Sequence, residues 1–432
     1  MRIAILGGGI TGVTTALFLA ERGHEPTIFE ASHRIGGLCG SDVVDGYVVD
    51  HAGGHIIYST DQEVLKFILD VLGPDGAVRN ERRTRIFHRG RYVSYPFENG
   101  LGDLSPEDNF DCLKGYVEAA FARRNGAEEP ADFHGWCLWR FGEGICRQFM
   151  HPYNEKIWNV DLRTLGTQWV RGRVPDAPID DVLKSAVGVK TVGYAHQSTF
   201  WYPRTGGFET IVHAIAAKLK AGVVRKSTPV KSVLRNGAAW RVNGEAFDRV
   251  VSTLPLTELA KVADEFPAAI RTAIGGSRYT SLQTVFVALK HDRLPNYSWA
   301  YFPHPENGPQ NRITYLSNYS PENAPPGAGS VMAEVTYLGT TPDPAETARE
   351  TVLGLVRCGV FGKDDVAFTK VYDNKYAYIL YEHGLEERID AVRAYARSLG
   401  LDLVGRFGNY NYYNSDRCIR AALDLATTIG KA

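Results

Sequence analysis

The sequence predicts an α/β protein in which a parallel βαβ fold is interrupted by a helical insertion and by an antiparallel β-sheet insertion. Three observations support this prediction. Residues 2–6 form an apolar run that leads directly into glycines and a helical pattern, as a buried parallel strand does when a helix follows it. Residues 105–190 have helical periodicity with many aromatic side chains. Residues 280–380 contain two clear runs typical of strands, over 282–289 and 330–337.

The length of the chain, 432 residues, is too great for a single hydrophobic core. The changes in periodicity along the chain predict three domains. The first domain is discontinuous and comprises residues 1–100, 197–260 and 385–432. Residues 101–196 are expected to form a helical domain, and residues 261–384 a β-sheet domain that faces the substrate.

The composition is that of an ordinary globular protein, with 44% hydrophobic residues, 22% charged residues and a formal net charge of -1. A net charge so close to zero excludes a global field that would gather nucleic acid. No apolar run approaches the ~18 residues of a membrane-spanning helix, and the first residues lack the basic region and cleavage site of a signal peptide. We therefore expect a cytoplasmic protein without a membrane span. The six cysteines have no CxxC spacing, so no metal site is expected.

The glycines after the first predicted strand fit the pattern GxGxxG at Gly7, Gly9 and Gly12. The first glycine permits a tight turn, the second lets the backbone approach a pyrophosphate, and the third brings the helix against the strand. A second predicted strand ends at Glu30, 18 residues after Gly12, where a carboxylate accepts hydrogen bonds from a ribose diol. Strand, glycines, helix, strand and acid in this order predict a dinucleotide-binding unit.

The residues that follow Glu30 favour FAD over NAD as the cofactor. Arg34 is followed closely by Gly36 and Gly37, two more glycines that allow the backbone to approach an extended cofactor. This arrangement resembles the glutathione-reductase-type FAD proteins, which include amine oxidases and sugar-nucleotide mutases. The first domain is therefore predicted to be a Rossmann-like FAD domain.

Eight further strings, in order along nearly the whole chain, give a more specific resemblance. They are Gly53–Tyr58, Tyr95–Asn99, Pro152–Trp158, Trp169–Arg173, Tyr202–Gly207, Arg312 with Asn318 and Tyr319, Tyr376–Tyr378, and Gly405–Gly408 with Tyr412 and Asp416. Together they resemble the UDP-galactopyranose mutase family, and its eukaryotic-type branch more than the short bacterial enzymes.

The resemblance implies an isomerase that interconverts the pyranose and furanose forms of a nucleotide sugar, with UDP-galactopyranose and UDP-galactofuranose as the expected pair. In that family, N5 of the reduced FAD is the nucleophile at the anomeric carbon, and there is no net oxidation. The chain would then serve cell wall or glycan biosynthesis. Its flavin would need an external reductant, either NADPH or a separate reductase.

The resemblance also implies roles for individual residues. Arg173 and Arg312 match the two arginines that grip the diphosphate, since a guanidinium can bind phosphate through two N–H groups. Gly54 and His55 match the turn beside flavin N5. The other implied cofactor contacts are Arg406 and Asp416. Among the implied substrate contacts, Asn154 and Trp158 match residues near the sugar, and Tyr319, Tyr378 and Tyr412 match tyrosines whose hydroxyls complete the phosphate site. The remaining implied substrate contacts are Tyr95, Glu98 and Gln197.

Two positions depart from the family pattern. Glu98 stands where the eukaryotic-type enzymes have a glutamine that contacts uracil, and Gln197 stands where the family tends to have an asparagine. An ionised carboxylate only accepts hydrogen bonds. Glu98 could therefore face a donor-rich base such as guanine or cytosine, or it could be a tolerated change in a UDP site.

An alternative is an FAD-dependent oxidoreductase of the protoporphyrinogen or amine oxidase type, which shares the scaffold. Arg173 and Arg312 together with the tyrosines favour an anionic diphosphate over an apolar amine or porphyrinogen. A flavin-binding protein without enzymatic activity has no specific feature in its favour. The sequence does not predict the oligomeric state.

Overall fold

The computed structural model describes residues 1–170, 174, 178–189, 198–237 and 239–431. The described residues contain a parallel sheet of five strands in the order β19-β13-β1-β2-β9. Its strands are β1 (Arg2–Leu6), β2 (Glu25–Phe29), β9 (Val224–Arg225), β13 (Arg249–Ser252) and β19 (Leu401–Leu403). The predicted α/β class with a Rossmann-like parallel sheet is confirmed.

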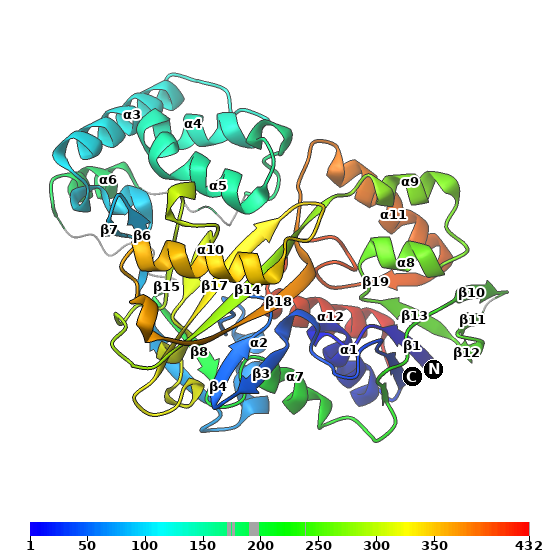
Figure 1. The fold of residues 1–432 in the computed structure, drawn as a ribbon. Coiled ribbons are helices and arrows are strands. Elements are labelled where there is room, and N and C mark those ends of the chain that lie inside the picture. Colours follow the sequence, from blue (N-terminus) through cyan, green and yellow to red (C-terminus); the bar gives the residue numbers. More distant parts are fainter. Residues whose placement is uncertain (171–173, 175–177, 190–197, 238, 432) are drawn as a thin grey trace.

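The parallel sheet is assembled from three distant parts of the chain around its central strands β1 and β13, which are apolar and largely buried. Ile3, Ala4, Ile5 and Leu6 in β1 are fully buried. The helix α1 (Ile10–Glu21) follows β1 and packs against α12 (Ser415–Ile429) near the other end of the chain. Figure 1 shows the two helices side by side, with both termini close to the parallel sheet.

A larger sheet of seven strands, counted in the described residues, has the order β18-β14-β17-β16-β15-β6-β7. Its neighbouring strands are antiparallel except for β15 and β6, which are parallel. Its strands are β6 (Thr84–His88), β7 (Arg91–Ser94), β14 (Tyr279–Leu289), β15 (Trp299–Tyr301), β16 (Arg312–Thr314), β17 (Gly329–Tyr337) and β18 (Val366–Ile379). The strands predicted over 282–289 and 330–337 correspond to the C-terminal eight residues of β14 and to nearly the whole of β17.

Two features of this sheet were not visible in the sequence. The strands β6 and β7 come from the segment expected to belong to the FAD domain, yet they hydrogen-bond to the edge of the large sheet through β15. The helix α10 (Pro344–Arg357) lies across the sheet and packs against β14 and β18 (Figure 1). The residues of β17 are all buried, so this strand lies at the centre of the molecule.

The helical region lies above the large sheet in Figure 1. It contains α3 (Pro106–Arg124), α4 (Phe133–Ile145), α5 (His151–Trp158) and α6 (Ile179–Ala186). The backbone of α4 is kinked at Gly142, which has a φ of 75°. A Cβ there would lie 2.0 Å from the carbonyl oxygen of Gly115, so glycine permits the close packing of α4 on α3.

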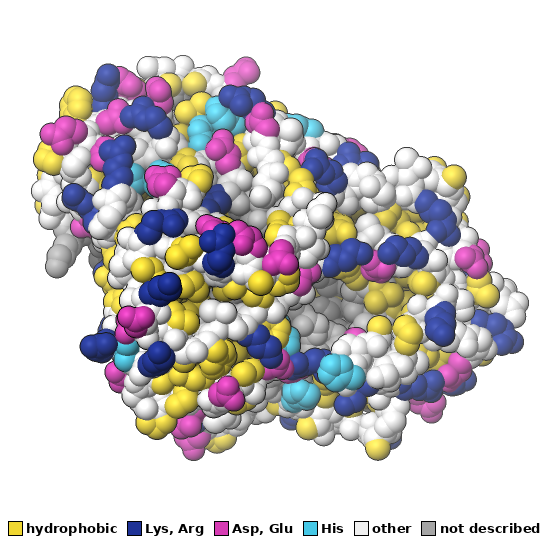
Figure 2. All heavy atoms as spheres, in the orientation of Figure 1, with side chains coloured by type: hydrophobic (Ala, Val, Ile, Leu, Met, Phe, Trp, Pro, Cys, Tyr) yellow, Lys and Arg dark blue, Asp and Glu magenta, His cyan; other side chains and the backbone are white. Residues whose placement is uncertain are grey.

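The remaining elements complete the core around the two sheets. They are α2 (Gln62–Leu72), α7 (Glu209–Ala216), α8 (Leu256–Val262), α9 (Ala268–Gly275), α11 (Leu385–Leu399), β3 (Ser41–Val44), β4 (Tyr47–Asp50), β5 (Ala77–Glu81), β8 (Thr199–Pro203), β10 (Val233–Asn236), β11 (Ala239–Val242) and β12 (Glu245–Phe247). Among the described residues, no helix is both long and apolar enough to cross a membrane. Figure 2 shows the molecule hollowed between the large sheet and the part that carries the parallel sheet.

Candidate active site

The glycine loop between β1 and α1 has the backbone geometry that its spacing predicts. Gly7 has a φ of 104°, and a Cβ on Gly12 would lie 2.0 Å from the carbonyl oxygen of Gly7. The first position therefore needs a left-handed conformation and the third cannot hold a side chain. Gly9, the residue before α1, makes no side-chain cap, and nothing lies closer than 4.0 Å to a Cβ built on it. The uncapped N–H groups at the start of α1 suit a pyrophosphate.

Glu30 lies directly after β2, at the edge of this loop. Its carboxylate accepts hydrogen bonds from the backbone N–H groups of Gly8 and Ser32, each at 2.7 Å. These bonds fix the acid at the carboxyl end of the parallel strands, where dinucleotides bind. Each carboxylate oxygen can accept more than one hydrogen bond, so Glu30 can also take a ribose hydroxyl.

The second pair of glycines lies against the first. The N–H of Gly36 donates to the carbonyl oxygen of Gly8 at 3.0 Å, and Gly36 forms a β-bridge with Gly9. Gly36 and Gly37 have φ values of 118° and 56°, which glycine adopts without strain. The two segments together present backbone without side chains along one surface. The residues present therefore fit an extended cofactor such as FAD.

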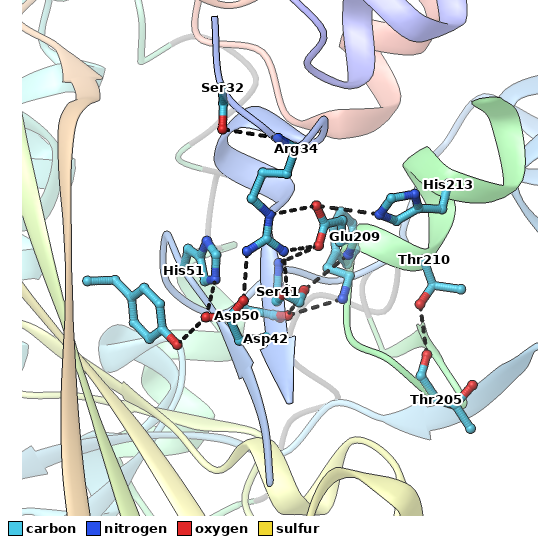
Figure 3. Close-up of polar contacts among 12 residues, drawn as sticks. Ser32, Arg34, Ser41, Asp42, Asp50, His51, Thr205, Glu209, Thr210 and His213 are labelled. Carbon is cyan, nitrogen blue, oxygen red and sulfur yellow. Dashed lines mark hydrogen bonds and ion pairs between the residues drawn. The ribbon is translucent and has the colours of Figure 1, made fainter. Parts of the chain in front are cut away.

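Arg34 holds the second glycine segment in place (Figure 3). Its Nε donates to Glu209 at 3.1 Å, its Nη1 donates to Asp42 at 2.6 Å, and its Nη2 contacts Glu209 and the carbonyl oxygen of Ser41. A Cβ on Gly36 would lie 3.0 Å from Glu209, so this ion pair packs under the glycine turn. The guanidinium of Arg34 thus makes its contacts within the protein, and its predicted direct contact with the cofactor stays a prediction.

Asp50 lies beneath the same segment and is fully buried. Its carboxylate accepts hydrogen bonds from the Ser41 hydroxyl at 2.6 Å, the Tyr202 hydroxyl at 2.8 Å and the Phe208 N–H at 3.1 Å. Burial raises the pKa of Asp50 to about 6, because these neutral donors only partly replace the water that an ionised carboxylate loses.

The predicted flavin-side turn at Gly54 and His55 lies against the large sheet. The N–H of Gly54 donates to Glu334 at 3.2 Å, and a Cβ on Gly54 would collide with the side chain of Thr314 at 2.2 Å. The ring of His55 stacks on Phe208 with centroids 5.0 Å apart. Burial and the positive charge of Arg312 lower the pKa of His55 to about 4, so its imidazole is neutral at physiological pH.

Arg312 and Glu334 form an ion pair beside this turn. They are directly opposite each other on β16 and β17. The Nε of Arg312 donates to Glu334 Oε1 at 2.7 Å, and its Nη2 lies 2.5 Å from the same oxygen and 3.5 Å from the carbonyl oxygen of Gly54. The hydroxyl of Tyr378 donates to the other carboxylate oxygen at 3.4 Å. Burial by itself would lower the pKa of Arg312. The negative charge of Glu334 has the larger opposite effect, so the pKa of Arg312 is raised well above its usual value.

Three tyrosine hydroxyls lie within electrostatic range of the guanidinium. The charge of Arg312 acts on the hydroxyls of Tyr153, Tyr319 and Tyr378, which places all three near it. Burial raises the pKa of each of these tyrosines above its usual value. Their hydroxyls therefore stay protonated and can donate hydrogen bonds to an anion.

The predicted sugar-side residues lie beside these tyrosines. Asn154 and Trp158 are both buried on α5, and the indole N–H of Trp158 donates to the side-chain oxygen of Asn154 at 3.2 Å. The indole ring meets the rings of Tyr378 and Tyr412 edge-on, with centroids 6.0 and 6.5 Å away. The structure thus brings Asn154 and Trp158, predicted for the sugar, next to Tyr378 and Tyr412, predicted for the phosphates.

Arg406 and Asp416 lie where the end of the chain returns to the glycine loop. The guanidinium of Arg406 lies 4.7 Å from the ring centroid of Tyr412 and donates to the carbonyl oxygens of Ala377 and Tyr413 at 2.9 and 2.8 Å. Asp416, in the first turn of α12, accepts a hydrogen bond from the hydroxyl of Ser59 at 2.8 Å. Their contacts with the cofactor stay predictions.

Tyr95 and Glu98 lie on the helical side of the cluster. The ring of Tyr95 is 5.4 Å from that of Tyr301. Glu98 is only 4% exposed, and its charge acts on the hydroxyls of Tyr95 and Tyr116. The nucleotide base that Glu98 would face stays a prediction. Arg173 and Gln197 lie outside the described residues.

The sequence prediction missed Glu334, Tyr153 and Tyr301. Tyr153 lies within a string that was singled out, but no role was given to it. Glu334 has a recognisable signal, because it is an acid in the middle of an apolar strand and a buried carboxylate needs a partner. Tyr301 has no local signal; it lies near Arg312 only because β15 pairs with β16.

The fold and the glycine loops define a flavoprotein, and the comparison with known families agrees. The chain belongs to the flavin-containing amine oxidoreductase family, whose profile matches residues 10–372. It is an FAD enzyme of this superfamily. Among solved structures it is similar to a reduced UDP-galactopyranose mutase, with 26% sequence identity, a TM-score of 0.90, and coverage of 99% of this chain and 95% of that one. The resemblance found in the sequence is thereby confirmed.

Other relatives carry different activities. The mitochondrial protoporphyrinogen oxidase of Nicotiana tabacum is 22% identical over 343 residues, which are 68% of this chain and 66% of that protein. The matched segment thus spans just under two thirds of that relative. A CLA-producing fatty acid isomerase from P. acnes is 14% identical, with a TM-score of 0.65 and coverage of 99% and 98%, which shows a shared fold alone. The fold therefore does not decide the reaction.

Proposed function

We propose that this chain is a flavin-dependent mutase that interconverts the pyranose and furanose forms of a nucleotide sugar, with the two UDP-galactose forms as the first candidates. The observation that carries the proposal is a partly buried guanidinium, that of Arg312, which lies beside the Gly54 turn and within electrostatic range of protonated tyrosine hydroxyls. The similarity to a reduced UDP-galactopyranose mutase over nearly the whole chain supports it.

Arg312 would bind the diphosphate of the substrate. Its Nε and Nη2 are engaged by Glu334, whereas Nη1 has no hydrogen-bond partner among the residues that the structure describes. The two N–H groups of Nη1 can donate to phosphate oxygens. The hydroxyl of Tyr319 can add a further donor, and the hydroxyl of Tyr378 can do so by exchanging its 3.4 Å hydrogen bond to Glu334 for one to phosphate. These groups would stabilise the diphosphate as it leaves the anomeric carbon. Arg173 would be the second arginine of this site.

FAD, when bound, supplies the nucleophilic N5 of its reduced form, and an external reductant such as NADPH or a reductase would maintain that form. Gly54 would place its carbonyl oxygen near N5, where it can accept a hydrogen bond. Glu334 holds the N–H of Gly54 while Arg312 approaches its carbonyl oxygen, so the turn and the diphosphate site are fixed relative to each other. Asn154 and Trp158 would orient the sugar, and neutral His55 would add no charge.

An oxidoreductase is the competing proposal, because a curated relative is a protoporphyrinogen oxidase. The guanidinium of Arg312 offers N–H donors, which suit an anion and not a cationic amine, so Arg312 disfavours an amine oxidase. An oxidase would also consume oxygen and release peroxide, whereas the mutase leaves the sugar at the same oxidation state.

The test is anaerobic incubation of dithionite-reduced protein with UDP-, GDP-, CDP- and TDP-hexofuranoses, followed by chromatography of the nucleotide sugars. We expect a pyranose product from at least one substrate with the reduced protein and none with the oxidised protein. The identity of that substrate also tests which base Glu98 accepts. Equal turnover by the oxidised protein, or peroxide release without a sugar isomer, would contradict the proposal.

A variant separates the role of Arg312 from general damage. Arg312→Lys keeps a positive charge for Glu334 but lacks the planar fork. We expect kcat/KM to fall by about 100-fold, in the range of a lost transition-state donor, with an unchanged flavin absorbance spectrum. The matched control is Arg249→Lys, which alters an ion pair with Asp402 in the parallel sheet and should retain activity. Unchanged kcat/KM in Arg312→Lys would remove this arginine from the site.

A further inference from the structure

A cavity lies in the helical region, between α3, α4 and the start of α6. Its volume is about 480 Å³, which is enough for a small organic molecule. None of its described lining residues belongs to α5, β16 or β17, the elements that carry Trp158, Arg312 and Glu334. Figure 1 shows the three helices grouped at one end of the molecule, far from the parallel sheet. The cavity is therefore distinct from the candidate active site.

Three arginines line this cavity, which we call the arginine pocket: Arg123 and Arg124 from α3, and Arg140 from α4. Tyr116 and Ala120 precede Arg123 by seven and by three residues, so all three lie on one face of α3 and line the pocket together. No acidic residue is among the described residues that line it. A cavity that collects guanidinium groups without carboxylates suits an anion.

Arg123 has the environment of a cation that lacks a counter-charge. It is partly buried, and its Nη1 donates to the carbonyl oxygens of Trp139 and Arg140, the latter at 2.8 Å. Neither Arg123 nor Arg124 forms an ion pair with another described residue. Burial and the positive charge of Arg140 lower the pKa of Arg123. A bound anion would offset the repulsion between the two guanidinium groups.

The position of the arginines at a helix end explains only part of this arrangement. Arg123 and Arg124 lie in the last turn of α3, where the helix dipole favours basic residues. The dipole of α3 does not account for Arg140, which comes from α4. It also gives no reason for Arg123 to be partly buried beside a second cation.

The rest of the lining combines apolar surface with the N-terminus of α6. Ala120 and Ile179 supply aliphatic carbon. Pro178 precedes α6 and makes no side-chain cap, so the first N–H groups of this helix are left to water or to a ligand. The acids of that first turn, Asp180 and Asp181, are not among the residues that line the pocket. The pocket therefore offers donors for an anion and an apolar wall beside them.

We propose that the arginine pocket binds a small organic phosphate, with the phosphate held by Arg123, Arg124 and Arg140 and the organic part against Ala120 and Ile179. A guanidinium matches a phosphate because two of its N–H groups can donate to two phosphate oxygens in parallel. Binding here requires neither the flavin nor Arg312, so the inference does not rest on the proposed mutase reaction.

The test is isothermal titration calorimetry of the FAD-loaded protein at low ionic strength, with phenyl phosphate and inorganic phosphate as probes. We expect phenyl phosphate to bind about tenfold more tightly, because its ring covers apolar surface. Arg123→Gln should raise both dissociation constants by about tenfold or more, as the loss of a charge-assisted hydrogen bond does. Arg124→Gln changes an exposed side chain, which leaves the packing intact, and should raise both constants by about threefold.

Two further variants show where the probes bind. Arg147→Gln removes an arginine of the same region that pairs with Asp111 outside the pocket, and it should leave both constants unchanged. Arg312→Lys should also leave them unchanged, whereas it would weaken a phosphate that binds in the candidate active site. The proposal is overturned if wild-type affinity persists in both Arg123→Gln and Arg124→Gln, or if binding is lost in Arg312→Lys. Equal affinity for the two probes would refute an organic ligand.

Discussion

Replacing Glu334 by alanine removes the carboxylate that organises the candidate active site. Glu334 is 1% exposed. It accepts hydrogen bonds from Arg312, from the N–H of Gly54 and from the hydroxyl of Tyr378. The alanine variant would leave the guanidinium of Arg312 without its counter-charge and the N–H of Gly54 without its acceptor.

The magnitude follows from these losses. Breaking a buried ion pair by removing one partner costs about 3–5 kcal/mol, and an unsatisfied buried N–H costs about 1–3 kcal/mol. The two costs overlap because they share one carboxylate and because water can enter the vacated space. We therefore expect Glu334→Ala to lose about 3–5 kcal/mol in the free energy of unfolding. Glu334→Gln keeps the volume and an acceptor oxygen and should lose less, about 1.5–3 kcal/mol.

The assay is guanidinium chloride unfolding of the FAD-loaded protein, followed by tryptophan fluorescence and by the fluorescence of released flavin. Asp70→Ala, which removes an exposed partner of Lys66, is the control and should unfold with the wild type. The reasoning fails if Glu334→Ala unfolds at the wild-type denaturant concentration. If Glu334→Gln were as stable as the wild type while Glu334→Ala were destabilised, the volume of the side chain would matter and its charge would not.

Two further predictions concern the cofactor side of the molecule. The Gly12→Ala variant should be purified with much less than one FAD per chain, because the new Cβ would lie 2.0 Å from the carbonyl oxygen of Gly7. The FAD content is measured from the ratio of flavin absorbance to protein absorbance. A full complement of FAD in this variant would contradict the reasoning. The pKa of Asp50 is raised to about 6 from 3.8, so the folded state holds a proton that the unfolded state has released between these values. The free energy of unfolding should therefore fall by roughly 3 kcal/mol as the pH rises from about 4 to about 6. The check is denaturant unfolding of the wild type and of Asp50→Asn at both pH values, and the variant should lack this pH-dependent loss.

The FAD domain could be predicted because its signals are local. Gly7, Gly9, Gly12 and Glu30 lie within one βαβ unit, and their roles depend on backbone conformation and on the N-terminus of the helix that follows. The second pair of glycines lies only a few residues further on. The structure adds how Arg34 supports that pair, through Glu209, which is 175 residues away in sequence.

The course of the chain through the large sheet was harder to predict from the sequence. Strands β14 and β17 were predicted because they are long apolar runs. The strands β6 and β7 were placed with the FAD domain because they are close to it in sequence, but β6 pairs with β15 of the large sheet and β7 pairs with β6. Hydrophobic pattern reveals that a strand exists and says little about which neighbour it pairs with.

The sequence by itself determined the cofactor, the α/β class and a set of aromatic and charged residues that resemble one family of mutases. Only the tertiary structure decided how these residues are combined. Arg312 meets Glu334 because β16 and β17 pair in one particular register, and a shift by a single residue would turn the two side chains to opposite faces of the sheet. Gly54 joins them from 280 residues away from Glu334. Glycine spacing is fixed by local backbone sterics, whereas the charge pairing at the site depends on strand register, which the sequence encodes only through the packing of the whole sheet.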